Sequence, residues 1–81
     1  VAHIDPKQQS IYPNPATDHI TIRTAEGNTI ELFASDGLLV ATTQATRPET
    51  SITVAQLPAG RYIVRISPLE GVPSLYPLII Q

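Results

Sequence analysis

The chain has 81 residues, which fits one domain and not two. Only 15% of the residues are charged, against about 25% in typical globular domains, and the net charge is −2 with no basic or acidic cluster, so nucleic acid and anionic lipid are poor candidate partners. The absence of cysteine excludes disulfides, thiol nucleophiles and cysteine metal sites.

The sequence also contains no methionine, so we expect the chain to be a part of a longer product or a processed form. Its longest apolar run is only a few residues, and we therefore expect no membrane insertion. No stretch resembles a signal peptide, so an N-terminal export signal would lie upstream of this chain.

The first predicted elements are a linker and a short strand. Residues 1–9 are polar and lack periodicity, which indicates a linker, and a short strand is expected at 10–12. Pro13 and Pro15 then fix φ and remove two backbone donors, while the proline after Asn14 biases that residue toward extended geometry. This stretch predicts a rigid terminator ahead of the next strand.

Two alternating segments follow. Period-two alternation begins at residue 18, and residues 26–28 supply turn residues for a hairpin that leads into a strand at 28–34. The residues expected to face inward are Ile20, Ile22, Thr24, Ile30, Leu32 and Ala34.

The middle of the chain predicts two further strands. Asp36 and Gly37 form the next turn, because this dipeptide readily supplies positive φ. The strand after it is expected to place Leu38 and Val40 inward. A loop around Pro48 precedes a strand at 50–54, whose inward residues are expected to be Ile52 and Val54.

The clearest strand spans residues 61–67, with Tyr62, Val64 and Ile66 on one face and the solvated Arg61 and Arg65 on the other. Before it, "LPAGRY" is typical of the tyrosine corner of immunoglobulin-like sandwiches, in which the tyrosine hydroxyl bonds to upstream backbone.

The backbone properties of glycine and proline predict two further features, one at the corner and one in the last strand. Gly60 is expected to adopt positive φ at the corner. The last strand, residues 75–81, contains Pro77, which confines it to a sheet edge or a bulge. About seven short strands with regular turn signals and no helical period predict an all-β, immunoglobulin-like antiparallel β-sandwich.

No catalytic, cofactor or metal site is predicted. His3 and His19 are the only histidines, and Asp18 and His19, as neighbours on a strand, are expected to point to opposite faces. No aspartate has calcium-loop spacing, and no serine lies in a nucleophile-elbow motif. We therefore expect a binding or recognition protein rather than an enzyme.

The order of these motifs over residues 10–81 resembles the C-terminal sorting domain of the type IX (Por) secretion system, type A. In one respect the sequence departs from that family, whose last strand usually carries basic residues near its end, because no basic residue follows Arg65. The motif residues are Pro13, Asn14, Pro15, Asp36, Gly37, Leu57, Pro58, Gly60, Tyr62, Val64 and Ile66.

The resemblance implies the function and the partners. Such domains lie at the C-terminus of exported cargo proteins and are recognised by an outer-membrane translocon. A sortase-like protease commonly removes them and attaches the cargo to the cell surface. Residues 1–9 would then link an N-terminal cargo domain to a sorting domain at 10–81. The protein would cross the periplasm and reach the cell surface or the exterior, without a cofactor.

The terminal segment has two interpretations, a buried core strand and a docking segment. They are compatible if one face of the strand packs against the core and the other binds a partner. The candidate recognition residues are Leu75, Leu78, Ile79, Ile80 and Gln81.

The alternative function is an accessory immunoglobulin- or fibronectin-like module that acts as a spacer or binds carbohydrate. A sugar-binding face needs two or three exposed aromatic side chains. The sequence offers only Tyr12, Phe33, Tyr62 and Tyr76, and Tyr62 is expected to be buried.

Overall fold

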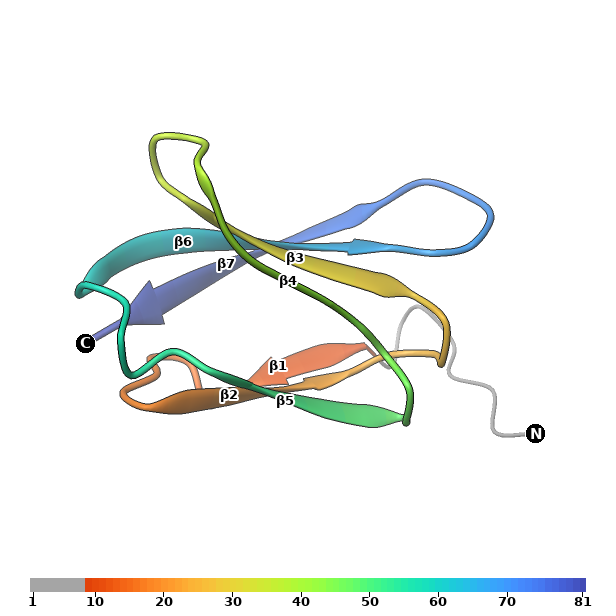
Figure 1. Ribbon diagram of the computed structural model, residues 1–81, viewed down its shortest axis with the longest axis horizontal. Helices are drawn as coiled ribbons and strands as arrows, with labels where there is room; N and C mark the ends of the chain where they lie inside the picture. Colours follow the sequence, from red (N-terminus) through yellow and green to blue (C-terminus); the bar gives the residue numbers. More distant parts are fainter. Residues whose placement is uncertain (1–8) are drawn as a thin grey trace.

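The computed structural model describes residues 9–81, which form two antiparallel sheets packed face to face (Figure 1). The three-stranded sheet has the order β1-β2-β5, and the four-stranded sheet has the order β4-β3-β6-β7. The predicted all-β sandwich of seven strands is confirmed. Within this described range no helix is long and apolar enough to cross a membrane. The strands are β1 (Ser10–Tyr12), β2 (His19–Arg23), β3 (Thr29–Ala34), β4 (Leu39–Gln44), β5 (Glu49–Thr53), β6 (Gly60–Ser67) and β7 (Ser74–Ile80).

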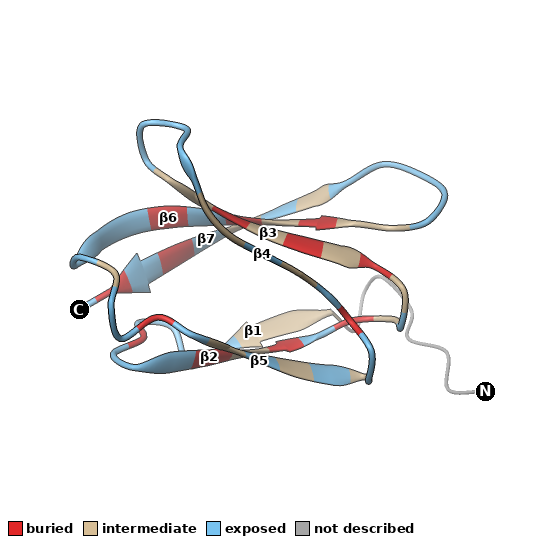
Figure 2. Ribbon diagram, in the orientation of Figure 1, coloured by how far each residue is buried: buried red, intermediate tan, exposed pale blue. Residues whose placement is uncertain are grey.

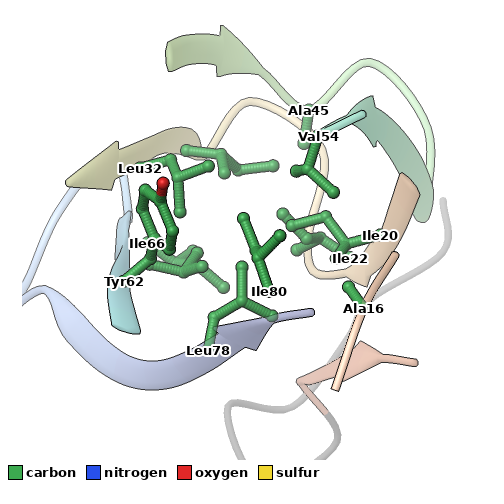
Figure 3. Close-up of a cluster of buried hydrophobic side chains, with 12 residues drawn as sticks. Ala16, Ile20, Ile22, Leu32, Ala45, Val54, Tyr62, Ile66, Leu78 and Ile80 are labelled. Carbon is green, nitrogen blue, oxygen red and sulfur yellow. The ribbon is translucent and has the colours of Figure 1, made fainter. Parts of the chain in front are cut away.

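The core lies between the sheets and consists of alternate residues of the strands together with Ala16, Ala45 and Val54 from the connections (Figure 2). Period-two alternation places every second side chain inward, so the aliphatic residues predicted for β2, β3 and β6 are buried. Val54 is also buried, and Ile52, Val40 and Ala34 pack against the cluster as predicted. Figure 3 shows the cluster, whose members are Ala16, Ile20, Ile22, Ile30, Leu32, Ala45, Val54, Tyr62, Val64, Ile66, Leu78 and Ile80.

The predicted hairpin between β2 and β3 is wrong, because these strands belong to different sheets. The turn residues at 26–28 form a turn, but it carries the chain from one sheet to the other. Its backbone pairs with the β4–β5 connection instead: the Gly27 N–H donates to the Ala45 carbonyl at 2.8 Å, and the Ala45 N–H donates to the Asn28 carbonyl at 2.9 Å. Glycine and asparagine suit both kinds of turn, so local composition did not distinguish them.

The prediction that Leu38 faces inward is also wrong, since its side chain is exposed. The register between β3 and β4 shifts by one residue: Leu32 is opposite Ala41, but Phe33 is opposite Leu39, so Val40 is the extra residue of a bulge. A bulge breaks the period-two alternation along its strand. The bulge lets both Val40 and Ala41 pack against the core, whereas Leu38 lies in the turn before β4 begins at Leu39 and is exposed there.

The tyrosine corner predicted at "LPAGRY" is present. Tyr62 is buried at the start of β6, and its hydroxyl donates to the carbonyl of Pro58 at 2.6 Å. Gly60, between them, has φ of +154°, and Gly37 of the β3–β4 turn has φ of +90°, as the turn chemistry predicted. The corner fixes the direction in which the chain leaves the three-stranded sheet and enters β6.

Replacing Tyr62 by Phe removes only the corner hydroxyl, so we expect the free energy of unfolding to fall by about 0.5–1.5 kcal/mol. Urea denaturation measures this loss. Tyr12→Phe is the matched control, because the Tyr12 hydroxyl also bonds a protein oxygen, that of Glu49, but at an exposed position; its effect should stay within about 0.5 kcal/mol. An unchanged midpoint for Tyr62→Phe would show that the corner bond does not stabilise the fold.

Candidate recognition site at the terminal strand

The terminal strand β7 divides the predicted recognition residues into two groups. Leu78 and Ile80 point into the core cluster and are almost fully buried (Figure 3). Leu75 is 64% exposed and Ile79 is 41% exposed, and Gln81 follows the strand at the surface. Only Leu75, Ile79 and Gln81 are therefore accessible to a partner in the folded domain.

On its inner edge, β7 pairs with β6 along its whole length, from Gly60 opposite Ile80 to Ile66 opposite Ser74. On its outer edge no further strand follows, since β7 ends the four-stranded sheet. The prediction that Pro77 confines this strand to an edge is confirmed. Backbone groups alternate between the two edges of a strand, and Pro77 occupies an outward position, so its missing N–H removes no bond to β6.

The loop before β2 contains the "PNP" motif and closes part of this outer edge. We name residues 13–16 the proline loop. Both prolines follow cis peptide bonds. The loop lies 58 or more residues from β7 in sequence, yet Ala16 is buried in the core and forms an isolated parallel bridge with Ile80. The motif that begins the domain is therefore in direct contact with the strand that ends it.

The contacts of the proline loop replace those of a neighbouring strand. The Asn14 side chain donates from Nδ2 to the Pro77 carbonyl and accepts the Ile79 N–H at Oδ1, both at 3.1 Å. The Ala16 N–H donates to the Ile79 carbonyl, and the Ala16 carbonyl accepts the Gln81 N–H, both at 2.8 Å. One amide side chain and one backbone residue thus satisfy four backbone groups at this edge.

A second set of contacts joins the start of the described chain to β7. The Gln9 amide donates from Nε2 to the Tyr76 hydroxyl at 2.9 Å and accepts the Thr24 hydroxyl at Oε1 at 2.7 Å. Thr24, which is fully buried, in turn accepts the Asn28 side-chain amide at 2.9 Å. The predicted linker at 1–9 lies outside the described residues except for Gln9, and Gln9 is bonded into the domain.

Sequence reasoning assigned no role to Gln9 or Ala16. Nothing local marks either residue, because their partners lie 15 to 67 residues away in sequence. For Asn14 a signal existed: two flanking prolines leave the backbone with few donors, so a polar side chain between them is suited to take over the pairing.

The described residues contain no cluster suited to hold a metal ion. The prediction that Asp18 and His19 point to opposite faces is wrong, since His19 Nδ1 lies 2.9 Å from Asp18 Oδ1. Strand β2 begins at His19, so the alternation rule does not extend to Asp18. This exposed pair stands alone, because among residues 9–81 no three side chains of the His, Cys, Asp or Glu type are grouped to hold a metal ion.

The aromatic side chains do not form a platform for a sugar. Tyr62 is buried and Tyr76 packs against the core. Phe33 lies beneath the Arg65 guanidinium, whose carbon is 4.8 Å from the ring centre. Tyr12 lies in the other sheet and donates its hydroxyl to the Glu49 carboxylate at 2.7 Å, a bond that raises the pKa of Tyr12.

Comparison with known proteins gives one family and one related fold. The model of the family described as "Secretion system C-terminal sorting domain" matches residues 10–79. The fold is similar to part of PorZ, an essential bacterial surface component of the type IX secretion system of Porphyromonas gingivalis, with a TM-score of 0.82 and 20% sequence identity over 93% of this chain. This chain spans 12% of the PorZ chain, so the likeness concerns the fold alone. No curated protein matches the sequence.

The contacts of Asn14 predict a measurable contribution to stability. Asn14→Ala removes both side-chain bonds to β7, and we expect the free energy of unfolding to fall by about 0.5–2 kcal/mol, because each net hydrogen bond contributes about 0.5–1.5 kcal/mol and these two are exposed. Urea denaturation measures the loss. Thr17→Ala, at an exposed neighbouring position, should change stability by less than about 0.5 kcal/mol. Equal midpoints for the two variants would contradict a stabilising role for Asn14.

Proposed function

Since the chain belongs to the family of secretion system C-terminal sorting domains, we propose that it directs an attached cargo protein to an outer-membrane translocon of the type IX secretion system. The sorting signal implies export toward the cell surface or the exterior. Transit through the periplasm, recognition by the translocon and removal by a sortase-like protease are the further steps of the proposal. Assignment to type A stays a prediction.

The observation that carries the proposal is the match of the family model to residues 10–79, nearly the whole of the described domain. The structure adds a physical basis for recognition. The terminal strand lies at a sheet edge, its inward side chains hold the core, and Leu75 and Ile79 remain exposed on its outer face. A partner can therefore contact this strand without unfolding the domain.

The proposed cleavage separates the cargo from the domain. From Gln9 onward the chain is bonded to Thr24 and Tyr76, and from Ser10 it pairs with β2. Protease sites need backbone that can be drawn into an active site. We therefore place the cleavage upstream of Gln9, where it leaves the sandwich and its terminal strand intact.

Deleting residues 75–81 is a poor test of recognition. The deletion removes the exposed Leu75 and Ile79, but it also removes Leu78 and Ile80 from the core. Loss of buried aliphatic side chains of this size costs about 2–5 kcal/mol each even on truncation to Ala. A small domain would then unfold, and failed secretion would report on folding.

Transfer of the whole domain is the direct test. Residues 1–81 are fused to the C-terminus of a periplasmic reporter and expressed in matched hosts with and without an intact type IX system. We expect reporter outside the cell only in the host with the intact system, and reporter without the domain to stay in the periplasm in both. Release in both hosts, or in neither while the fusion is folded, would refute the function.

A further inference from the structure

The outer face of the four-stranded sheet carries a continuous apolar row. Residues directly opposite one another in a sheet point to the same face. Leu39 is opposite Phe33, Phe33 is opposite Ile63, and Ile63 is opposite Pro77. These four residues, the outer apolar row, cross β4, β3, β6 and β7. The row faces away from the core, because the residues next to it on β3 and β6 are the buried ones.

Two apolar residues of β7 widen this row on one side. Leu75 and Ile79 flank Pro77 on the same face of the strand, and they are 64% and 41% exposed. Leu39 and Ile63 are 45% and 38% exposed. Exposed apolar side chains are ordinary when scattered, but a contiguous set on one face of a small domain is typical of an interaction surface.

The outer face of the three-stranded sheet is different. Its residues alternate with the inward Ile11, Ile20, Ile22 and Ile52, and all but one are polar or charged. The exception is Tyr12, whose hydroxyl is bonded to Glu49. The residues of this face are Ser10, Tyr12, His19, Thr21, Arg23, Glu49, Ser51 and Thr53. One outer face of the sandwich is therefore polar, whereas the other carries the outer apolar row with charged residues of β3 and β6 beside it.

The charges beside the outer apolar row are not balanced. Arg65 forms an ion pair with Glu31 at 2.7 Å across β3 and β6. Arg61 projects from the same face opposite Ile79, is exposed, and has no carboxylate partner among the described residues. It also borders a surface hollow of about 220 Å³ whose other lining residues are Ser35, Tyr62 and Ile63.

We propose that this face is the docking surface for a protein of the secretion machinery that offers apolar side chains and a carboxylate. The inference rests on the proposed function and specifies how the sorting domain is recognised. Apolar side chains of the partner cover the outer apolar row, and one of them fills the hollow. The partner's carboxylate pairs with Arg61. An apolar patch with arginine at its rim has the composition of a protein interface core.

The observations favour a partner protein over an anionic lipid surface or a second copy of this domain. Binding to anionic lipid needs clusters of basic residues, whereas this face carries one unbalanced arginine in a chain of net charge −2. A symmetric dimer would bring the same face of two copies together. Arg61 would then meet a second copy of a face whose carboxylate, Glu31 of β3, is already paired with Arg65.

Two variants at the face and one elsewhere test the proposal. Arg61→Glu reverses the charge, and Ile63→Thr interrupts the outer apolar row while keeping a β-branched side chain. Arg47→Glu makes the same charge change at an exposed loop position and is the control. Each is placed in the reporter fusion, and the denaturation midpoint of each purified domain verifies that it is folded. We expect Arg61→Glu and Ile63→Thr to lower secretion by about tenfold, with Arg47→Glu unchanged.

Binding is then measured with outer-membrane vesicles from the two matched hosts as the probe. We expect the wild-type domain and Arg47→Glu to bind only vesicles that carry the type IX system, and both face variants to bind about tenfold more weakly. If folded face variants are secreted and bound like wild type, the docking surface is wrong while the sorting function stands. Secretion of the wild-type fusion without the system would instead refute the sorting function itself.

Two further results would overturn the choice of partner. Binding of the wild-type domain to phosphatidylglycerol liposomes that Arg61→Glu abolishes would assign the face to lipid. Sedimentation of the domain as a dimer that Ile63→Thr dissociates would assign it to a second copy. The proposal predicts a monomer that does not bind the liposomes and that binds vesicles carrying the type IX system through Arg61 and Ile63.

Discussion

The bonding of the proline loop to the outer edge of β7 is the contact on which the rest of the domain depends. An uncovered sheet edge is open to pairing with other chains, and proteins protect such edges. Here Asn14 and Ala16 satisfy the outward groups of Pro77 and Ile79 and the N–H of Gln81. The same contacts hold the beginning of the domain against its end, so the terminal strand is fixed in register from both sides.

A terminal strand held in this way can serve the fold and recognition at once. Its inward residues Leu78 and Ile80 belong to the core, while Leu75 and Ile79 lie on the outer face beside Ile63. The interpretations as a core strand and as a docking segment are therefore compatible, because alternation places different residues of β7 on the two faces. In the proposed docking, the partner contacts a surface of the folded sheet and not the terminal sequence alone.

Much of the fold could be predicted, since alternation is a local signal and it correctly marked the buried residues of β2, β3 and β6. The tyrosine corner was predictable for the same reason, because Tyr62 and Pro58 are four residues apart. The errors arose where distant pairing decides local geometry. Leu38 lies in the β3–β4 turn and not in β4, and the turn at 26–28 connects the two sheets. Asn14 bonds to Pro77 and Ile79, which are 63 and 65 residues away in sequence, so composition identified the motif but not its contact.

Hydrogen exchange of the backbone amides in the native domain measures whether the proline loop closes the outer edge of β7. We expect the amides of Ile79 and Gln81 to be protected, because Asn14 and Ala16 accept them. The Leu75 amide also faces the outer edge but has no acceptor among the described residues, so it should exchange far faster. Equal, fast exchange of the Ile79, Gln81 and Leu75 amides would contradict closure of this edge by the proline loop.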